Sequence, residues 1–167
     1  DATRLEIRRH LPTARSIHVA GNLPYSVTTP LLLRLLAERE HFGRAVVMIQ
    51  REVAERLGAE PSTKDYGSLT VLFQMYFDVE LLFEVSPGCF WPRPEVTSTV
   101  LALVPLDTPR YAVPSQAALE RVVRAAFSQR RKTLWNSMRG AFAGEALQAA
   151  AAAAEIDLGR RAETLTG

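Results

Sequence analysis

Short apolar runs alternate with helix-forming segments over the first 105 residues, and this alternation limits the folds open to the chain. Apolar runs bounded by Gly, Asn or Pro predict strands, and a proline followed by leucines predicts the first turn of a helix. The expected strands are residues 16–20, 45–49, 79–85 and 97–104, and the expected helices are 30–36, 51–57 and 68–76. The proline-rich segment 87–94 is too long for a tight hairpin turn. We therefore predict an α/β fold with an antiparallel strand at its end.

No further strand is expected after residue 105. Residues 106–115 contain Pro109 and Pro114 and are typical of a linker. Apolar residues at helical spacing then predict helices over 116–127, 133–142 and 145–154, the last of them very rich in alanine. The expected organisation is a partial α/β domain over 1–105, a linker over 106–115 and a small all-α domain over 116–167.

The composition excludes several classes of protein. A chain of 167 residues that is 47% hydrophobic can bury a core, which excludes disorder. Cys89 is the single cysteine, and the three histidines lack the spacing of zinc ligands, so we predict no disulfide and no metal. No apolar run approaches the roughly 18 residues of a membrane span, and no signal-peptide pattern opens the chain. We expect a soluble, cytoplasmic protein.

The formal net charge is only +2, but the basic residues are concentrated in one segment. Between Glu120 and Glu145 the sequence contains no acidic residue, while six basic residues fall there: Arg121, Arg124, Arg130, Arg131, Lys132 and Arg139. Such a segment suits contacts with nucleic-acid phosphates. The same pattern also fits a solvated helix face.

Asn22, Leu23, Pro24 and Tyr25 follow an apolar run, which places them at the end of the first expected strand. The Asn22 amide oxygen and the carbonyl of Leu23 or Pro24 can accept both N–H bonds of an adenine N6 amine. The Tyr25 ring offers a face on which an extruded base can stack. Alternatively, the tetrapeptide is a strand-to-loop turn with a core tyrosine.

Five blocks in a fixed order make the resemblance to a known family specific. The segments 22–32, 50–57, 66–69, 90–98 and 127–137 resemble the ribosomal RNA adenine N6,N6-dimethyltransferase family. The Arg-Ala-Glu at 161–163 resembles a C-terminal segment of the same family. The resemblance covers nearly the whole chain. It implies a Rossmann-like class I methyltransferase sheet followed by a small all-α domain.

The resemblance also implies an activity and its partners. The family uses S-adenosylmethionine to dimethylate two adjacent adenines in the 3′-terminal hairpin of small-subunit (16S) rRNA during ribosome biogenesis. We therefore expect this rRNA, within a small-subunit particle, as the partner of a monomeric enzyme. The six basic residues are expected to contact the rRNA backbone.

The resemblance also implies which residues of this sequence form the site, because they match the family's motifs. Asn22 would touch both the cofactor and the target amine, and Tyr25 and Phe90 would stack on the two faces of the flipped base. The expected catalytic residues are Asn22, Leu23, Pro24, Tyr25 and Phe90, and the expected cofactor-binding residues are Asp1, Ala2, Asn22 and Leu23. Phe90 and Trp91 also fit a role as core aromatics, and we interpret Trp91 as a packing residue. Tyr66 and Gly67 predict a helix entry turn.

The family's glycine-rich cofactor loop and its ribose-binding acidic residue have no counterpart in the sequence. We therefore expect an N-terminally truncated chain that is inactive by itself. The related large-subunit (23S) rRNA methyltransferase of the macrolide-resistance type is disfavoured by the segment 127–132. A non-catalytic RNA-binding assembly or transcription factor on the same fold is a further alternative. A DNA adenine methyltransferase fits less well, because Leu23 departs from its motif.

Overall fold

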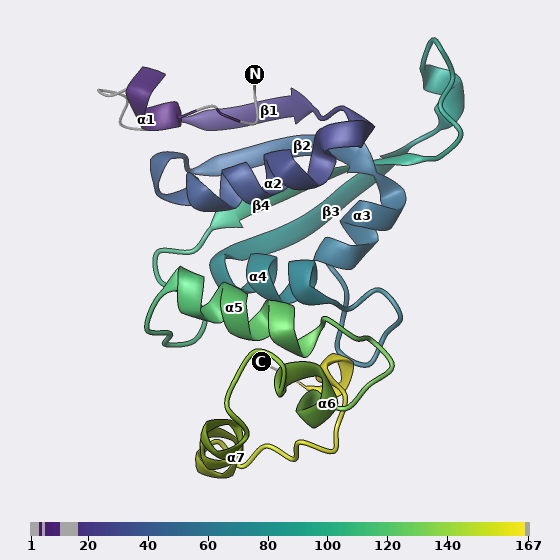
Figure 1. Cartoon of the computed structure of the whole chain (residues 1–167). Coiled ribbons are helices and arrows are strands. Elements are labelled where there is room, and N and C mark those ends of the chain that lie inside the picture. Colours follow the sequence, from purple (N-terminus) through teal and green to yellow (C-terminus); the bar gives the residue numbers. More distant parts are fainter. Residues whose placement is uncertain (1–3, 5, 11–16, 166–167) are drawn as a thin grey trace. The chain divides into compact units, whose positions relative to one another are not determined.

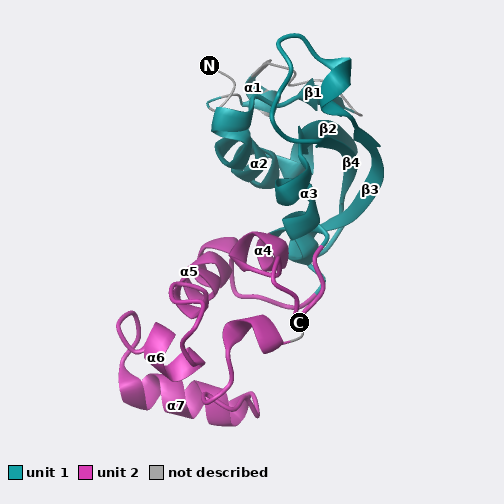
Figure 2. Ribbon diagram, turned by 90° about the vertical axis from the view of Figure 1, so that its right-hand side faces the viewer, with its two compact units in different colours: residues 1–58, 73–110 teal, residues 59–72, 111–167 magenta. Residues whose placement is uncertain are grey.

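A computed structural model of the chain describes residues 4, 6–10 and 17–165. The chain forms two compact units, coloured separately in Figure 2. The first unit comprises Asp1–Gly58 and Phe73–Arg110, and the second comprises Ala59–Leu72 and Tyr111–Gly167. Each unit has its own hydrophobic core, so the two are described separately.

A four-stranded mixed sheet forms the centre of the first unit (Figure 1). Its strands are β1 (His18–Asn22), β2 (Arg44–Gln50), β3 (Phe77–Val85) and β4 (Ser98–Pro105), in the order β1-β2-β4-β3. β1 and β2 are parallel, whereas β4 runs antiparallel to both β2 and β3. The predicted α/β fold with antiparallel pairing at its end is confirmed. The first strand starts two residues later than expected and ends at Asn22, so this residue closes the strand.

Helices of the first unit lie on one face of the sheet, as both views show. They are α1 (Ile7–His10), α2 (Thr28–Ala37) and α3 (Arg51–Leu57), with the short 3₁₀ turns η2 (Tyr25–Val27) and η3 (Arg39–His41). A further 3₁₀ turn, η4 (Pro87–Cys89), lies in the loop between β3 and β4. Alternate β2 residues are buried, because one face of the strand packs under the helices. The buried side chains include Leu32, Leu36, Ala45, Val47, Ile49, Phe73, Phe77, Leu101 and Leu103.

The helix α4 (Ser68–Tyr76) begins where the turn at Tyr66 and Gly67 was expected. The Gly67 backbone N–H donates to the Thr70 hydroxyl oxygen over 3.0 Å and so caps the helix start. The division between the two units falls inside this helix.

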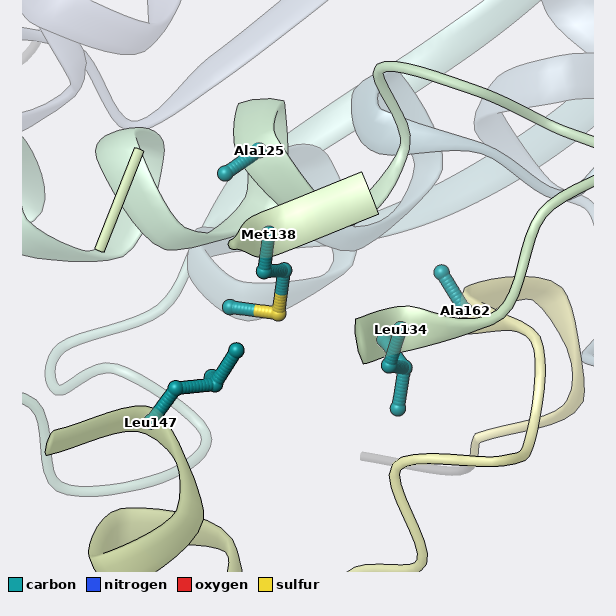
Figure 3. Close-up of a cluster of buried hydrophobic side chains, with 5 residues drawn as sticks. All are labelled: Ala125, Leu134, Met138, Leu147 and Ala162. Carbon is teal, nitrogen blue, oxygen red and sulfur yellow. The ribbon is translucent and has the colours of Figure 1, made fainter. Parts of the chain in front are cut away.

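Short helices around a small core form the second unit. They are α5 (Gln116–Ala126), α6 (Leu134–Met138), α7 (Gly144–Ala153) and the 3₁₀ turn η5 (Ala162–Thr164). Ser115 caps α5 by accepting the Ala118 N–H, and Thr133 caps α6 by accepting the Asn136 N–H. Figure 3 shows the core side chains, which are Ala125, Leu134, Met138, Leu147 and Ala162.

Two expectations for this region differ from the structure. The helix expected over 133–142 ends at Met138, because the Met138 carbonyl accepts the N–H groups of Ala141 and Phe142 in a closing turn. Residues 59–72 group with the C-terminal helices, although the expected division lay at residue 105. The physical reason is a set of contacts with distant parts of the chain: the Ser62 N–H donates to the Glu163 carbonyl over 2.7 Å, and the Tyr66 ring packs on Phe127. None of the helices in the described ranges is long and apolar enough to span a bilayer.

Candidate active site

All the residues expected to be catalytic line one open hollow of about 370 Å³. Its lining consists of Asn22, Leu23, Pro24, Tyr25, Phe90, Pro92 and Pro94. The sheet register explains why segments distant in sequence meet here. Asn22 pairs with Met48, and Ser98 pairs with both Gln50 and Val85, so β1 ends at the same edge of the sheet where β3 ends and β4 begins. The carboxyl ends of parallel strands are the usual place for a ligand in such sheets.

Backbone hydrogen bonds of residues 22–25 determine which carbonyl oxygen is available to a ligand. The Leu23 N–H donates to the Met48 carbonyl over 3.0 Å and so extends the β1–β2 ladder past Asn22. The Pro24 carbonyl accepts the Val27 N–H at 3.0 Å and the Thr28 hydroxyl at 3.1 Å, which uses both of its lone pairs. No described residue donates to the Leu23 carbonyl. Of the two carbonyls that the sequence left open, the structure therefore favours Leu23.

Tyr25 is half-buried and begins the turn η2. Its hydroxyl lies 2.6 Å from the hydroxyl of Ser98, a residue that is only 1% exposed. This hydrogen bond fixes the far end of the ring. Ser98 is not among the site residues expected from the sequence. Its position as the last residue of the block 90–98 was the available signal.

Phe90 is half-buried and directly follows η4 within the proline-rich segment 87–94. The Ser86 hydroxyl accepts the Gly88 N–H, and the Phe90 N–H donates to the Pro87 carbonyl, so the turn before Phe90 is held internally. Trp91, interpreted from sequence as a packing residue, is 97% exposed, and that interpretation was wrong. The physical reason is that Phe90 and Pro92 both face the hollow, whereas Trp91 does not line it.

The hollow contains few groups that could transfer a proton. None of its lining residues carries a carboxylate, an imidazole or an amine. In the described part of the chain, no group of three or more His, Cys, Asp and Glu side chains could hold a metal ion. The arrangement can bind and orient a planar polar ligand but offers no general base.

A second hollow, of about 230 Å³, lies beside the first and shares Asn22, Leu23 and Pro24 with it. Its other walls are largely apolar and come mainly from α1, β1, β2 and α2. Its carboxylate belongs to Glu38, which accepts the Ile7 N–H at 3.1 Å and an Arg34 N–H at 2.6 Å. Asn22 therefore stands between two hollows, which fits a residue that touches two ligands. Asp1 and Ala2, also expected at the cofactor, lie outside the described residues.

The six basic residues expected to bind RNA fall into two groups. Three of them are engaged within the second unit. Arg121 donates to the Ala141 carbonyl and covers the Phe142 ring, Arg124 pairs with Glu120, and Arg130 bonds to Glu163 and the Lys64 carbonyl. The other three, Arg131, Lys132 and Arg139, are exposed and make no ion pair with any described residue. This second group can contact a phosphate without giving up any ion pair with a described residue.

The family model and the relatives that match this sequence agree with one another. The sequence model of the family "Ribosomal RNA adenine dimethylase" matches residues 3–166. "Ribosomal RNA small subunit methyltransferase A" of Geobacter metallireducens is 50% identical over 151 residues, which cover 89% of this chain and 55% of that protein. The protein of the same name from Clostridium acetobutylicum is 45% identical over 167 residues, covering 99% and 60%. The chain thus spans well under two thirds of these relatives.

Two solved structures share the fold. A dimethyladenosine transferase from Plasmodium falciparum superposes with a TM-score of 0.68 at 21% identity, covering 92% of this chain and 65% of that one. The 23S rRNA methyltransferase ErmE superposes with a TM-score of 0.66 at 22% identity, covering 99% and 65%. At these identities the likeness shows the fold alone, and it confirms the expected methyltransferase fold.

Proposed function

Because this chain belongs to the ribosomal RNA adenine dimethylase family, we propose that it supplies the target-base site of an S-adenosylmethionine-dependent enzyme. The proposed reaction dimethylates the N6 amines of two adjacent adenines in the 3′-terminal hairpin of small-subunit rRNA. One observation carries the proposal: Asn22, the available Leu23 carbonyl, Tyr25 and Phe90 meet in a single hollow. These groups match the needs of an extruded adenine, which are two acceptors for its amine and aromatic faces for its ring.

The two acceptors explain how the chain would activate a poor nucleophile. The lone pair of an adenine amine is delocalised into the ring. Hydrogen bonds from the amine to the Asn22 amide oxygen and the Leu23 carbonyl would favour a pyramidal nitrogen whose lone pair points out of the ring plane. Holding that nitrogen in line with its electrophile supplies the remaining catalytic effect.

S-adenosylmethionine would supply an electrophilic methyl group on a sulfonium sulfur. The donor set fits this cofactor in part, since Asn22 and Leu23 line the second, apolar hollow, while the sequence has no glycine-rich loop. The amine nitrogen becomes acidic only after it has gained the methyl group, so its proton can leave to water. A hollow without a carboxylate or imidazole is therefore consistent with the proposed chemistry.

A large-subunit substrate is the nearest alternative. The fold likeness to a 23S rRNA methyltransferase does not favour it, because that likeness reflects the fold alone. The closer sequence similarity is to proteins named for the small subunit. We therefore propose the small-subunit substrate.

The test replaces Asn22 in the protein extended to the length of its curated relatives. Asn22→Ala should lower single-turnover methylation of an unmodified small-subunit particle by roughly a hundredfold or more, with little change in RNA affinity. Asn136→Ala is the matched control, because Asn136 is the only other asparagine and lies on α6 in the other unit. Methylation by Asn22→Ala at the parental rate would show that Asn22 does not hold the target amine. If the extended parent methylated a large-subunit particle instead, the substrate would be large-subunit rRNA.

A further inference from the structure

The position of Trp91 extends the proposed site. We propose that the Trp91 indole is a stacking platform for an unpaired nucleotide next to the base held in the hollow, with Arg93 contacting the adjoining phosphate. This inference rests on the proposed function, because it names a second RNA contact of the same site. Its ligand is a single-stranded RNA segment.

The surroundings of Trp91, rather than its exposure alone, support this proposal. The residue is 97% exposed, and its neighbours Phe90 and Pro92 both line the hollow. Consecutive Cα atoms are about 3.8 Å apart, so Trp91 lies within reach of a nucleotide that follows or precedes a base held against Phe90. An indole offers a large flat face, and stacking on it tolerates any base.

The backbone around Trp91 is already restricted, which lowers the entropic cost of ordering it. Pro92 and Pro94 fix their own φ angles, and each limits the residue before it to extended conformations. Those preceding residues are Trp91 and Arg93. The turn before Phe90 is held by its own hydrogen bonds. The aromatic side chain is thus presented on a stiff segment, as suits a preorganised binding site.

The charge of the segment fits RNA. Arg93 is exposed, and no described residue forms an ion pair with it. Glu95, also exposed, is the one acidic residue between Ser86 and Ser98. Aromatic faces combined with basic side chains are the usual means of holding single strands. A protein partner would instead use the exposed apolar residues of β3, of which Phe83 is 59% exposed.

Tryptophan fluorescence can report directly whether a base stacks on Trp91. The chain has two tryptophans, so Trp135→Phe leaves Trp91 as the only reporter. Titration with a hairpin carrying two adjacent adenines in its loop should quench the Trp91 emission in parallel with binding, whereas a fully paired duplex should not quench it. Binding of the hairpin with unchanged Trp91 emission would overturn the proposal. If Trp135→Phe does not fold by thermal melting, the same quenching is measured as the difference between the parent and Trp91→Phe.

Affinity gives the second readout, measured on the protein extended to the length of its relatives. Trp91→Ala should weaken hairpin binding by roughly five- to a hundredfold, and Trp91→Phe should retain most of the affinity. Phe83→Ala is the matched control and should bind normally; a decrease equal to that of Trp91→Ala would indicate an apolar docking face and contradict the platform.

The two proposals fail in different ways. If the extended parent methylates the small-subunit particle and Trp91→Ala equals it in hairpin affinity and methylation rate, the platform is refuted and the proposed function stands. An extended parent whose Trp91 is quenched by the hairpin but that never methylates an unmodified small-subunit particle would refute the function and support the platform.

Discussion

The Tyr25 hydroxyl lies 2.6 Å from the Ser98 hydroxyl, so the residue that opens the turn after β1 is tied to the first residue of β4. The distance is at the short end for a bond between two hydroxyl groups. β2 lies between these two strands in the sheet, so this side-chain bond spans the strand that separates them. The orientation of the proposed stacking ring therefore depends on a buried serine that does not line the hollow.

Ser98→Ala should lower methylation by the extended protein because it releases the Tyr25 ring, and it should cost about 1 kcal/mol of stability. Tyr25→Phe should have a similar effect, and the double variant should be no worse than either single one. Single-turnover rates and thermal melting of the four proteins measure this coupling. Additive effects would show that the two hydroxyls act independently.

Removal of either proposed stacking ring should weaken binding of the target hairpin. Tyr25→Ala and Phe90→Ala should each cost on the order of 1–3 kcal/mol, which is the value of one stacked base. Both titration and thermal melting are needed, because the alternative is that these rings pack the fold. A lowered melting temperature with normal RNA affinity would support that alternative, and an unaltered affinity with an intact fold would remove the ring from the site.

Neutralising Arg131, Lys132 and Arg139 should weaken RNA binding without loss of stability. Because exposed cations contact phosphates rather than bases, cognate and mutated hairpins should be affected alike. The slope of log affinity against log salt should flatten by about 0.7–0.9 for each RNA phosphate that the variant no longer neutralises. An unchanged slope would mean that the three residues form a solvated face.

Arg130→Gln is expected to behave differently from its neighbours. Arg130 bonds to Glu163 and to the Lys64 carbonyl, so its removal should loosen the segment 59–72 from the C-terminal helices. A lower melting temperature, measured beside Arg131→Gln as the matched control, would show this. Equal melting temperatures for the two variants would contradict it.

The stability of the second unit should fall in alkali. Burial and the neighbouring Tyr111 raise the pKa of Tyr66 above its ordinary value of 10.0. The unfolded chain therefore loses this proton first, so the contribution of Tyr66 is complete below pH 10.0 and is lost as the pH rises through the folded pKa. Urea unfolding at several pH values should show this decline, and Tyr66→Phe should reduce it. An identical pH dependence in both proteins would exclude Tyr66 as its source.

The 167-residue chain should bind S-adenosylmethionine weakly, whereas the protein extended to the length of its relatives should bind it well. The reason is that the sequence contains no glycine-rich loop to hold the cofactor. Calorimetric titration of both proteins decides the matter. Submillimolar binding by the 167-residue chain would mean that the cofactor site is misplaced.

The sequence predicted the strands and helices of the first unit because apolar runs and prolines mark them directly. It also predicted the meeting of Asn22, Tyr25 and Phe90, through a family resemblance. It could not choose between the Leu23 and Pro24 carbonyls, because that choice depends on the Val27 and Thr28 donors of a turn. The sequence also did not predict the exposure of Trp91, because an aromatic residue beside prolines is compatible with both a core and a surface position.

A contact between distant segments explains the place of residues 59–72. Residues 59–72 are polar and typical of a loop, but their place with the C-terminal helices depends on Glu163, about a hundred residues later. No local pattern encodes such a bond. The early end of α6 has a nearby cause instead, namely the turn in which the Met138 carbonyl accepts the Ala141 and Phe142 N–H groups.

β1 has one unpaired side within the described residues, where it bonds to β2 alone. Since the Leu23 N–H and the Ile17 carbonyl both face β2, alternation along the strand directs the N–H groups of His18, Ala20 and Asn22 the other way. In this chain these three amides should exchange rapidly with deuterium. In a longer form of the protein that adds a strand at this side, the same amides should become protected. Amide exchange at Asn22 would thus report whether the backbone of the proposed active site is held from one side or from two.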